Sequence, residues 1–383
     1  MTTVTVWDGS TDTDWHTAAN WSNGVPTTSL IASIPSAPSN QPTMSSDGTA
    51  HALQLDSGAT LTGGSNITLY ITGESAGETD APPDGFAVNL DGAISGELSL
   101  NITTPAGTYV DLIPSSGNVH NLTINHSSAD IEVAAGTGVT TTIAGDLTIT
   151  TGKLSMDDRD ENLTVTGDVL ISDGGTLGFS SSAETGAFSF GSLKIESGGT
   201  YNATSGVTEI TNVINATDYA FQNSTTGTFA HNGGTFTFSA SKYKNLDTGG
   251  DPFNDLISTG TNEFRNQRGL TVEGDFTISS AGSGYFRPNG NAFTVDGDVA
   301  INSGGEIRCT DEADTFGSLT IADGGTYNAT SGTTTITGPD STGSYLIEVA
   351  AADGIIHNKG KFLINADNTS TKYIKSNYWY DIE

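Results

Sequence analysis

The chain has 383 residues, a net charge of -31 from 13 basic and 44 acidic side chains, and an apolar fraction of only 34%. Helical bundles and doubly wound α/β folds are poor candidates, because such cores need a larger apolar fraction. Disordered chains share this composition, but here apolar and polar residues alternate along much of the sequence, as half-buried strands require. We therefore expect an all-β protein.

The distribution of charge and of apolar residues along the sequence argues against nucleic acids and membranes as partners. No Lys or Arg precedes Lys153, whereas 15 acidic residues lie between Asp8 and Asp146. Such a surface repels phosphate backbones and anionic headgroups, so we expect no nucleic-acid partner. No apolar run approaches the roughly 20 residues of a membrane span, so no membrane insertion is expected. A single cysteine, Cys309, excludes an intrachain disulfide framework. Residues 1–10 lack the pattern of a signal peptide, so we expect no Sec export if Met1 is the native start.

The first predicted element is a cap or docking unit at residues 1–49. It holds three of the four tryptophans and four of the prolines: Trp7, Trp15, Trp21, Pro26, Pro35, Pro38 and Pro42. Stacked repeat proteins need atypical terminal units to cover the open end of the stack. Residues 50–118 follow as divergent coils, which residues 52–73, ALQLDSGATLTGGSNITLYITG, illustrate.

Two related modules come next, at residues 119–252 and 253–354. FGSLKIESGGTYNATSG at residues 190–206 returns as FGSLTIADGGTYNATSG at residues 316–332, an offset of 126. LTVTGDVLISDGGTL, which begins at Leu163, matches FTVDGDVAINSGGEI, which begins at Phe293, at an offset of 130. The chain therefore contains an internal duplication.

A shorter period runs inside each module. Gly145, Gly167 and Gly191 are spaced 22 and 24 residues apart, and the second module repeats similar spacings of 23 and 20. This period is typical of one coil of a parallel β-solenoid, whereas the Gly-Gly pairs would also suit an antiparallel sandwich or barrel. We predict a right-handed parallel β-solenoid (β-helix) with the N-terminal Trp/Pro-rich cap, and about 14 coils at ~22 residues each.

Alternation identifies the inward side chains of the aligned coils. In the first module they are Leu163, Val165, Val169, Ile171, Leu177 and Phe179; in the second they are Phe293, Val295, Val299, Ile301, Ile307 and Cys309. Cys309 thus takes the place of Phe179, and we interpret it as a small buried hydrophobe rather than a reactive thiol.

The last predicted element is an aromatic and basic tail at residues 355–383. Its candidate interface residues are Lys372, Tyr373, Lys375, Tyr378, Trp379 and Tyr380. Aromatic side chains could stack on sugar rings or pack across a subunit interface. We favour the interface, because Tyr and Trp are enriched there and the lysines could pair with the acidic surface of another subunit.

The opening VWDGSTDTDWHTAANWSNGVPTTSLIASIP, the segment ALQLDSGATLT and the repeated LTVTGDV and GDLTI coils resemble the repetitive β-helical surface proteins of phage and archaeal-virus appendages and of bacterial adhesins. The resemblance covers nearly the whole chain and concerns architecture rather than an active-site motif. It implies a non-enzymatic structural protein of a virion surface, such as a tail fibre, spike or capsid decoration, that contributes to host attachment or particle stability. It also implies a homotrimer, with other virion proteins and a host surface glycan as partners.

Two other functions stay open at this point. Exported adhesins with such coils normally carry a signal peptide, whose absence favours a virion protein over a secreted or cell-surface bacterial or archaeal adhesin. A polysaccharide-degrading β-helix enzyme is the third reading, because grooves along β-helices accommodate glycans.

Two acidic clusters lie between coils of the two modules: Asp157, Asp158, Asp160 and Glu161 in one, and Asp311, Glu312 and Asp314 in the other. Carboxylates in a loop can bind calcium or supply an acid and a base for glycoside cleavage, but solvated turn residues are the reading we favour. The calcium candidates are Asp157, Asp158, Asp160, Asp311, Glu312 and Asp314. We expect no other cofactor and no catalytic residue, and the six histidines form no HExxH zinc motif.

Overall fold

The structure is a computed structural model that describes residues 3–75, 85–103, 110–113, 119–133, 138–156, 160–179, 184–280, 284–339, 343–350, 353–366 and 373–376. These residues form strands and one short 3-10 helix, η1 (Ala18–Asn20), which confirms the all-β prediction. None of the helical structure in the described part of the chain has the length and hydropathy of a membrane-crossing helix.

The strands up to β18 are β1 (Thr3–Val6), β2 (Leu30–Ile34), β3 (Thr43–Met44), β4 (Gly48–Ala50), β5 (Leu53–Leu55), β6 (Thr60–Gly63), β7 (Thr68–Ile71), β8 (Phe86–Leu90), β9 (Ala93–Gly96), β10 (Ser99–Ile102), β11 (Val110–Ile113), β12 (Asn121–Val133), β13 (Thr140–Ile143), β14 (Leu147–Met156), β15 (Asn162–Ile171), β16 (Gly175–Phe179), β17 (Phe188–Ile195) and β18 (Thr200–Asn202). The remaining strands are β19 (Val207–Ile210), β20 (Tyr219–Asn223), β21 (Thr228–Ala230), β22 (Thr235–Phe238), β23 (Lys244–Asp247), β24 (Asp255–Ser258), β25 (Glu263–Asn266), β26 (Leu270–Val272), β27 (Phe276–Ile278), β28 (Tyr285–Arg287), β29 (Phe293–Ile301), β30 (Glu306–Arg308), β31 (Asp314–Ile321), β32 (Thr326–Asn328), β33 (Thr333–Ile336), β34 (Tyr345–Val349), β35 (Ile355–Ile356), β36 (Lys361–Ile364) and β37 (Tyr373–Ser376).

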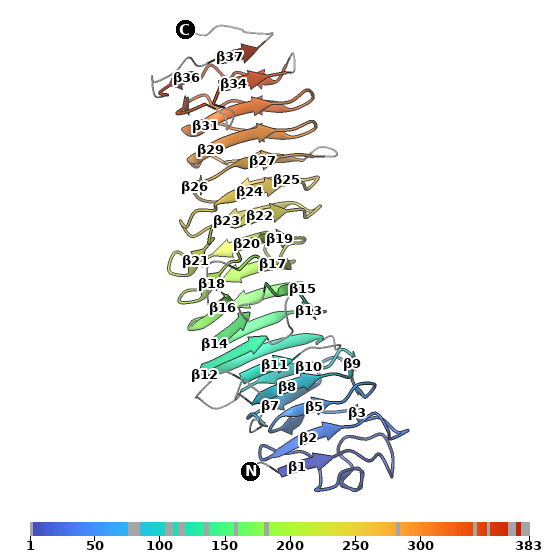
Figure 1. The fold of residues 1–383 in the computed structure, drawn as a ribbon. Coiled ribbons are helices and arrows are strands. Elements are labelled where there is room, and N and C mark those ends of the chain that lie inside the picture. Colours follow the sequence, from blue (N-terminus) through green and yellow to red (C-terminus); the bar gives the residue numbers. More distant parts are fainter. Residues whose placement is uncertain are drawn as a thin grey trace. The chain divides into compact units, whose positions relative to one another are not determined.

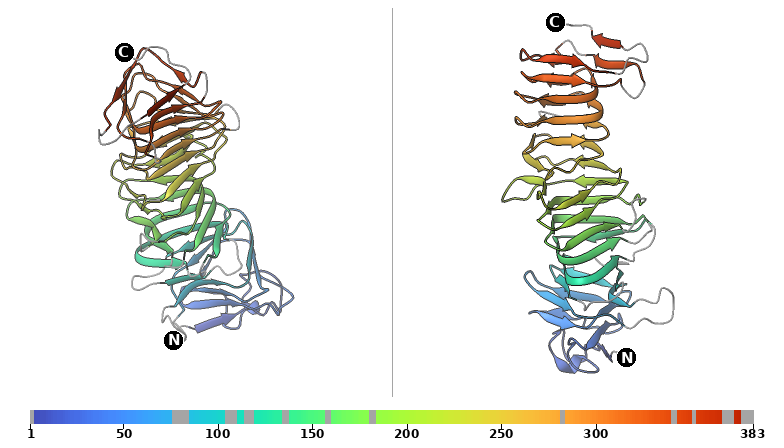
Figure 2. Two further views of the ribbon diagram at one scale, coloured as in Figure 1. Left: turned by 45° about the horizontal axis from the view of Figure 1, so that its top comes forward. Right: turned by 90° about the vertical axis from the view of Figure 1, so that its left-hand side faces the viewer.

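Parallel pairing between successive coils organises these strands. In each unit the strands of one coil lie above those of the coil before (Figure 1), and the further views show the same stacking (Figure 2). Typical ladders are β14 with β16 and β29 with β31, both parallel. About 14 turns of solenoid result, so the parallel β-solenoid prediction is confirmed over the antiparallel sandwich or barrel.

The chain divides into two compact units. Unit 1 comprises residues 1–189 and 195–202, and unit 2 comprises residues 190–194 and 203–383. Strand β2 of unit 1 already pairs in parallel with β5, so the ladder of coils begins within the predicted cap.

In-register stacking explains the buried core. In unit 1, Ile143 lies against Val165, and in unit 2, Val295 lies against Phe316. Because alternate side chains share a face, each register pair continues one inward column. All twelve inward residues predicted from the two aligned coils are buried, including Cys309, which confirms the predicted inward face.

Aromatic rings fill much of the core of unit 2. The ring of Phe253 lies 5.4 Å from that of Phe221, 5.2 Å from Phe229 and 4.9 Å from Phe236, measured between centroids. Edge-to-face and tilted geometries of this kind stabilise aromatic pairs beyond their burial.

A tryptophan cluster forms the N-terminal part of unit 1, as the sequence predicts. The Trp21 ring lies 5.1 Å from Trp7 and 4.8 Å from Trp15, both edge-to-face. The indole N–H of Trp7 donates to the carbonyl of Asn40 at 2.7 Å. The cluster is therefore a packed aromatic core with a polar anchor.

Paired glycines turn corresponding corners in both modules. Gly174 and Gly198 have φ of 76° and 78°, and Gly304 and Gly324 have φ of 76° and 81°. The N–H of Gly304 donates to the carbonyl of Gly324 at 2.9 Å, which links one corner to the next. Positive φ is a conformation that glycine adopts without strain, so these residues serve the architecture.

Candidate functional site

The first acidic cluster lies only partly within the described residues, which exclude Asp157 and Asp158. Asp160 is exposed, and its Oδ1 accepts hydrogen bonds from the backbone N–H of Thr185 at 2.6 Å and from the Thr185 hydroxyl at 2.9 Å. These bonds, the backbone one foremost, lower the pKa of Asp160. This carboxylate fastens one turn to the turn of the following coil.

In the second acidic cluster, Glu312 organises the turn between β30 and β31. Its Oε2 accepts hydrogen bonds from the backbone N–H groups of Thr310 and Asp311, both at 3.0 Å, and from the Thr310 hydroxyl at 2.7 Å. Glu312 is buried, whereas Asp311 points to the exposed side of the turn.

Asp314, the first residue of β31, occupies an inward position. It lies in register with Phe293 of β29 and Thr334 of β33, and it is fully buried. Its Oδ2 accepts a hydrogen bond from the Tyr327 hydroxyl at 2.8 Å, and that hydroxyl lies 2.8 Å from the Thr334 hydroxyl. Oδ1 of Asp314 is also buried, and it accepts no well-directed hydrogen bond.

Cys309 completes a cluster with these two carboxylates, which we call the thiol–carboxylate cluster: Cys309, Glu312 and Asp314. The Sγ atom and one oxygen of each carboxylate all lie within 4.8 Å of one another, and all three residues are buried. Burial raises the pKa of Asp314 to about 7, although the nearby Cys309 thiol and Tyr327 hydroxyl oppose the shift. Burial, with Coulomb repulsion from Asp314, also raises the pKa of the Cys309 thiol.

The first module holds an apolar pair at the corresponding positions. Phe179 and Phe188 stack with centroids 5.1 Å apart, and both are buried. Cys309 stands where Phe179 stands, and the offset of 126 places Asp314 opposite Phe188. The predicted core position of Cys309 is confirmed, whereas the prediction of a solvated turn residue at Asp314 is wrong, because Asp314 begins β31 and is fully buried. The signal that identifies the cluster is the exchange of an inward Phe for Asp between duplicated coils.

An arginine ladder lies on the outward face of unit 2, formed by Arg265, Arg287 and Arg308. Arg265 is in register with Arg287 across β25 and β28, and β30 carries Arg308 on the next coil. The guanidinium of Arg308 lies 3.6 Å from the centroid of the Tyr285 ring. The ladder concentrates positive charge and aromatic surface in a chain of strongly negative net charge.

Two glutamates form ion pairs with the arginines of the ladder. Glu263 lies 2.8 Å from Arg265 and 3.6 Å from Arg287, and it accepts a hydrogen bond from the Tyr285 hydroxyl at 2.8 Å. Burial alone would raise the pKa of Glu263, but hydrogen bonds from Tyr285 and Arg265 and attraction to the arginines outweigh it and lower that pKa. On the next coil Glu306 binds Arg308 through two contacts, at 2.6 and 2.7 Å.

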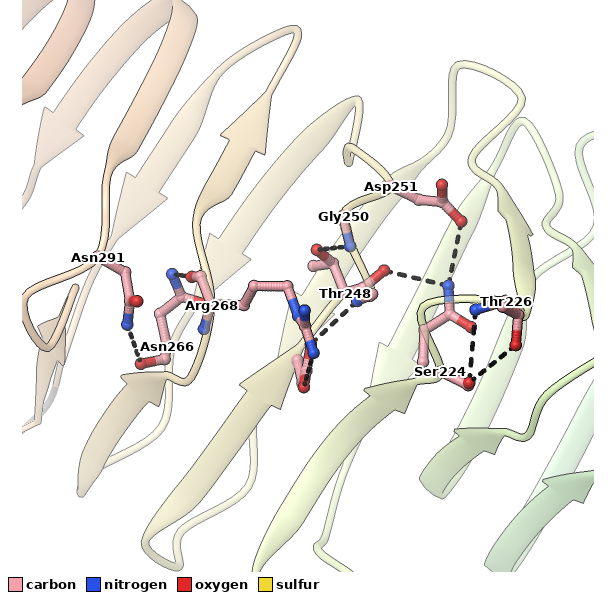
Figure 3. Close-up of polar contacts among 11 residues, drawn as sticks. Ser224, Thr226, Thr248, Gly250, Asp251, Asn266, Arg268 and Asn291 are labelled. Atoms are coloured by element: carbon pink, nitrogen blue, oxygen red, sulfur yellow. Dashed lines mark hydrogen bonds and ion pairs between the residues drawn. The ribbon is translucent and has the colours of Figure 1, made fainter.

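Polar side chains also link the coil corners of unit 2 (Figure 3). The side-chain amide of Asn223 donates to the Thr248 carbonyl at 3.1 Å and to Asp251 Oδ2 at 3.0 Å. Arg268 Nε donates to Asp247 Oδ1 at 2.9 Å. These contacts join successive coils.

Lys244 is a fully buried cation at the start of β23. Its Nζ donates to the carbonyl of Ala240 at 3.1 Å and lies 3.5 Å from that of Asn262 and 5.7 Å from the Phe264 ring centroid. Burial lowers its pKa to about 8.

Only part of the predicted C-terminal interface lies within the described residues. Tyr373 and Lys375 belong to β37, whereas Lys372, Tyr378, Trp379 and Tyr380 lie outside them. Tyr373 is 54% exposed, and Lys375 Nζ lies 2.5 Å from Glu348 of the same chain. Large apolar side chains are exposed on these last strands: Ile356, Leu363, Ile364 and Ile374. The interface itself remains a prediction.

Residues 6–81 match a family model described as a domain of unknown function (DUF8693). This segment contains the tryptophan cluster and the first coils of unit 1. No curated protein and no solved structure matches the chain.

Proposed function

We propose that the chain is a non-enzymatic structural protein of a virus particle surface, as a tail fibre, spike or capsid decoration. The observation that supports this proposal is the repetition of one coil chemistry through both modules. In each, parallel backbone ladders enclose a column of buried apolar side chains. A secreted or cell-surface adhesin is the alternative that shares this observation.

The stacked coils suit a role outside the cell. Each coil contacts mainly its neighbours, so stability accumulates from coil to coil rather than depending on one central core. The corner contacts and the arginine ladder add side-chain links between the same coils. The net charge of -31 favours solubility and repels nucleic acid, which suits an outer component of a particle.

Host attachment is the more specific part of the proposal. The arginine ladder gathers three guanidinium groups and the Tyr285 ring on one outward face, where an acidic glycan would compete with Glu263 and Glu306 for the arginines. We therefore place the contact with a host surface glycan on this outward face of unit 2. A homotrimer and contacts with other virion proteins rest on the resemblance to fibre and spike proteins.

Immunogold electron microscopy of infected cultures tests the proposal. Label on released particles is the expected result, whereas label confined to the cell envelope or the medium would support the adhesin. Release of reducing sugar from host polysaccharide by the purified chain would instead support an enzyme. Binding of purified chain to host cells, compared with that of an Arg265→Ser/Arg287→Ser variant, tests the attachment face separately.

A further inference from the structure

The three side chains of the thiol–carboxylate cluster are of types that bind metal ions. They are buried in a coil whose counterpart in the first module has Phe179 and Phe188 in place of Cys309 and Asp314. The inward column that contains Phe293 is interrupted by Asp314, whose buried Oδ1 accepts no hydrogen bond from outside the cluster. Among the residues that the structure describes, no Lys, Arg or His forms an ion pair with Asp314 or Glu312. Buried carboxylates without a charge partner are costly, so a bound cation would supply what the site lacks.

We propose that Cys309, Glu312 and Asp314 bind one zinc ion, with a water molecule as the fourth ligand. Thiolate and carboxylate ligands together suit Zn²⁺, whereas Ca²⁺ takes only oxygen ligands. Two ligand atoms on a tetrahedral zinc ion lie about 3.6 Å apart, given bonds of about 2.1 and 2.3 Å. The ligand atoms here all lie within 4.8 Å of one another, and binding would draw them to that spacing. Binding keeps one water ligand of the hydrated ion and replaces the others with one Zn–S and two Zn–O bonds to the protein, and the thiol proton and any proton held by Asp314 pass to solvent.

The surroundings already orient the ligands. The backbone and hydroxyl donors of the turn hold Glu312, and the Tyr327 hydroxyl holds Asp314 Oδ2 at 2.8 Å, which leaves Oδ1 for the metal. Partners of this kind fix the direction of metal ligands, and their loss typically weakens metal binding by about 10- to 100-fold. Tyr327 is therefore a positioning residue. The first module, with Phe179 and Phe188 at the matching places, keeps the same coil without these ligands.

Cobalt substitution and zinc titration of the purified full-length chain test the proposal. Because Cys309 is the only cysteine, a thiolate-to-Co²⁺ charge-transfer absorption can arise from no other residue. We expect that absorption, one Zn²⁺ per chain by elemental analysis after gel filtration, and loss of both in Cys309→Ala and in Asp314→Asn. Tyr327→Phe should bind about 10-fold more weakly.

Asp311→Asn is the matched control, because this exposed carboxylate lies beside the cluster but outside it. It should bind zinc as the unaltered chain does, whereas a calcium site in the acidic turn would be weakened. If Cys309→Ala fails to fold, the cobalt spectrum of the unaltered chain decides the question alone. Absence of the charge-transfer absorption at saturating Co²⁺, or equal zinc binding by a folded Cys309→Ala variant, would overturn the proposal.

Discussion

At the residue scale, the direction of a side chain decides its effect on stability. Val165 is 1% exposed and lies in the inward column, whereas Thr166, the next residue of β15, is exposed. Val165→Asp should lower the free energy of unfolding by several kcal/mol, because it buries an unpaired carboxylate. Thr166→Asp should change it by about 0.5 kcal/mol or less. Thermal unfolding of both variants checks this, and equal shifts would show that the two residues do not face opposite sides.

Lys244 gives the chain a pH dependence whose sign follows from its lowered pKa. Between about pH 8 and 10.5 the unfolded chain keeps the Lys244 proton while the folded chain has lost it. The unfolded state then binds more protons, so this group makes the free energy of unfolding rise with pH across that window, by about 3 kcal/mol in total.

Lys244→Met should remove this rise. Denaturant unfolding of both proteins from pH 7.5 to 10.5 measures it as a difference, in which the titration of other groups largely cancels. Parallel curves for the two proteins would show that Lys244 is not a buried cation. The expected result is that the unaltered chain gains free energy of unfolding relative to Lys244→Met as the pH rises.

The sequence predicts the direction of a side chain correctly where polarity and burial agree. Val165 and Phe293 are inward because alternation and duplication both place them there. Lys244 and Asp314 are also inward, but a pattern of apolar residues cannot reveal buried charged ones. Their environments depend on groups that the fold brings in from more distant parts of the sequence, such as the Asn262 carbonyl and the Tyr327 hydroxyl.

At the element scale, outward side chains on adjacent strands act as connected ladders. Glu263 of β25 contacts Arg265, Arg287 and Tyr285, whereas Glu306 of β30 pairs mainly with Arg308. Glu263→Gln should therefore cost about 1–3 kcal/mol of stability, since it leaves two arginines without their shared carboxylate. Glu306→Gln removes one partner of a half-exposed pair and should cost about 1 kcal/mol or less.

Urea unfolding at low and high salt measures both variants. The Glu263→Gln effect should shrink in high salt, as expected for partly exposed charges. Equal costs for the two variants would mean that the shared contacts of Glu263 add nothing to its stabilising role.

At the element scale, the sequence predicts the coil period but not the contacts between outward side chains of adjacent coils. The Gly spacing of 20 to 24 residues predicts one coil per repeat, and corner glycines such as Gly174 and Gly198 confirm why glycine recurs there. The arginine ladder was not predicted, although Arg265, Arg287 and Arg308 are spaced 22 and 21 residues apart, within the coil period; the strand register is what places them on one outward face.

At the scale of the whole molecule, self-association is expected to depend on the C-terminal segment. Tyr373 and Ile374 are 54% and 40% exposed on β37, and β36 carries the further exposed apolar residues Leu363 and Ile364. Deletion of residues 355–383 should leave a folded but less associated protein, because the preceding coils carry their own ladders. Light scattering at matched salt compares the molar masses.

A double substitution tests the same prediction without deleting any strand, in case the truncated chain misfolds. Tyr373→Ser/Ile374→Ser changes only exposed side chains and should also reduce the molar mass. If circular dichroism shows both variants folded and their molar masses equal that of the full chain, the C-terminal segment is not the element of assembly.

Mass spectrometry of purified virus particles tests whether the chain is a structural component of a particle surface. After nuclease treatment and a high-salt wash, intact particles should retain peptides of this chain in many copies per particle. Brief protease treatment of intact particles should then remove them, because the chain lies outside. Particles that contain none of the chain, while the cell envelope or the medium of the same culture does, would contradict the claim.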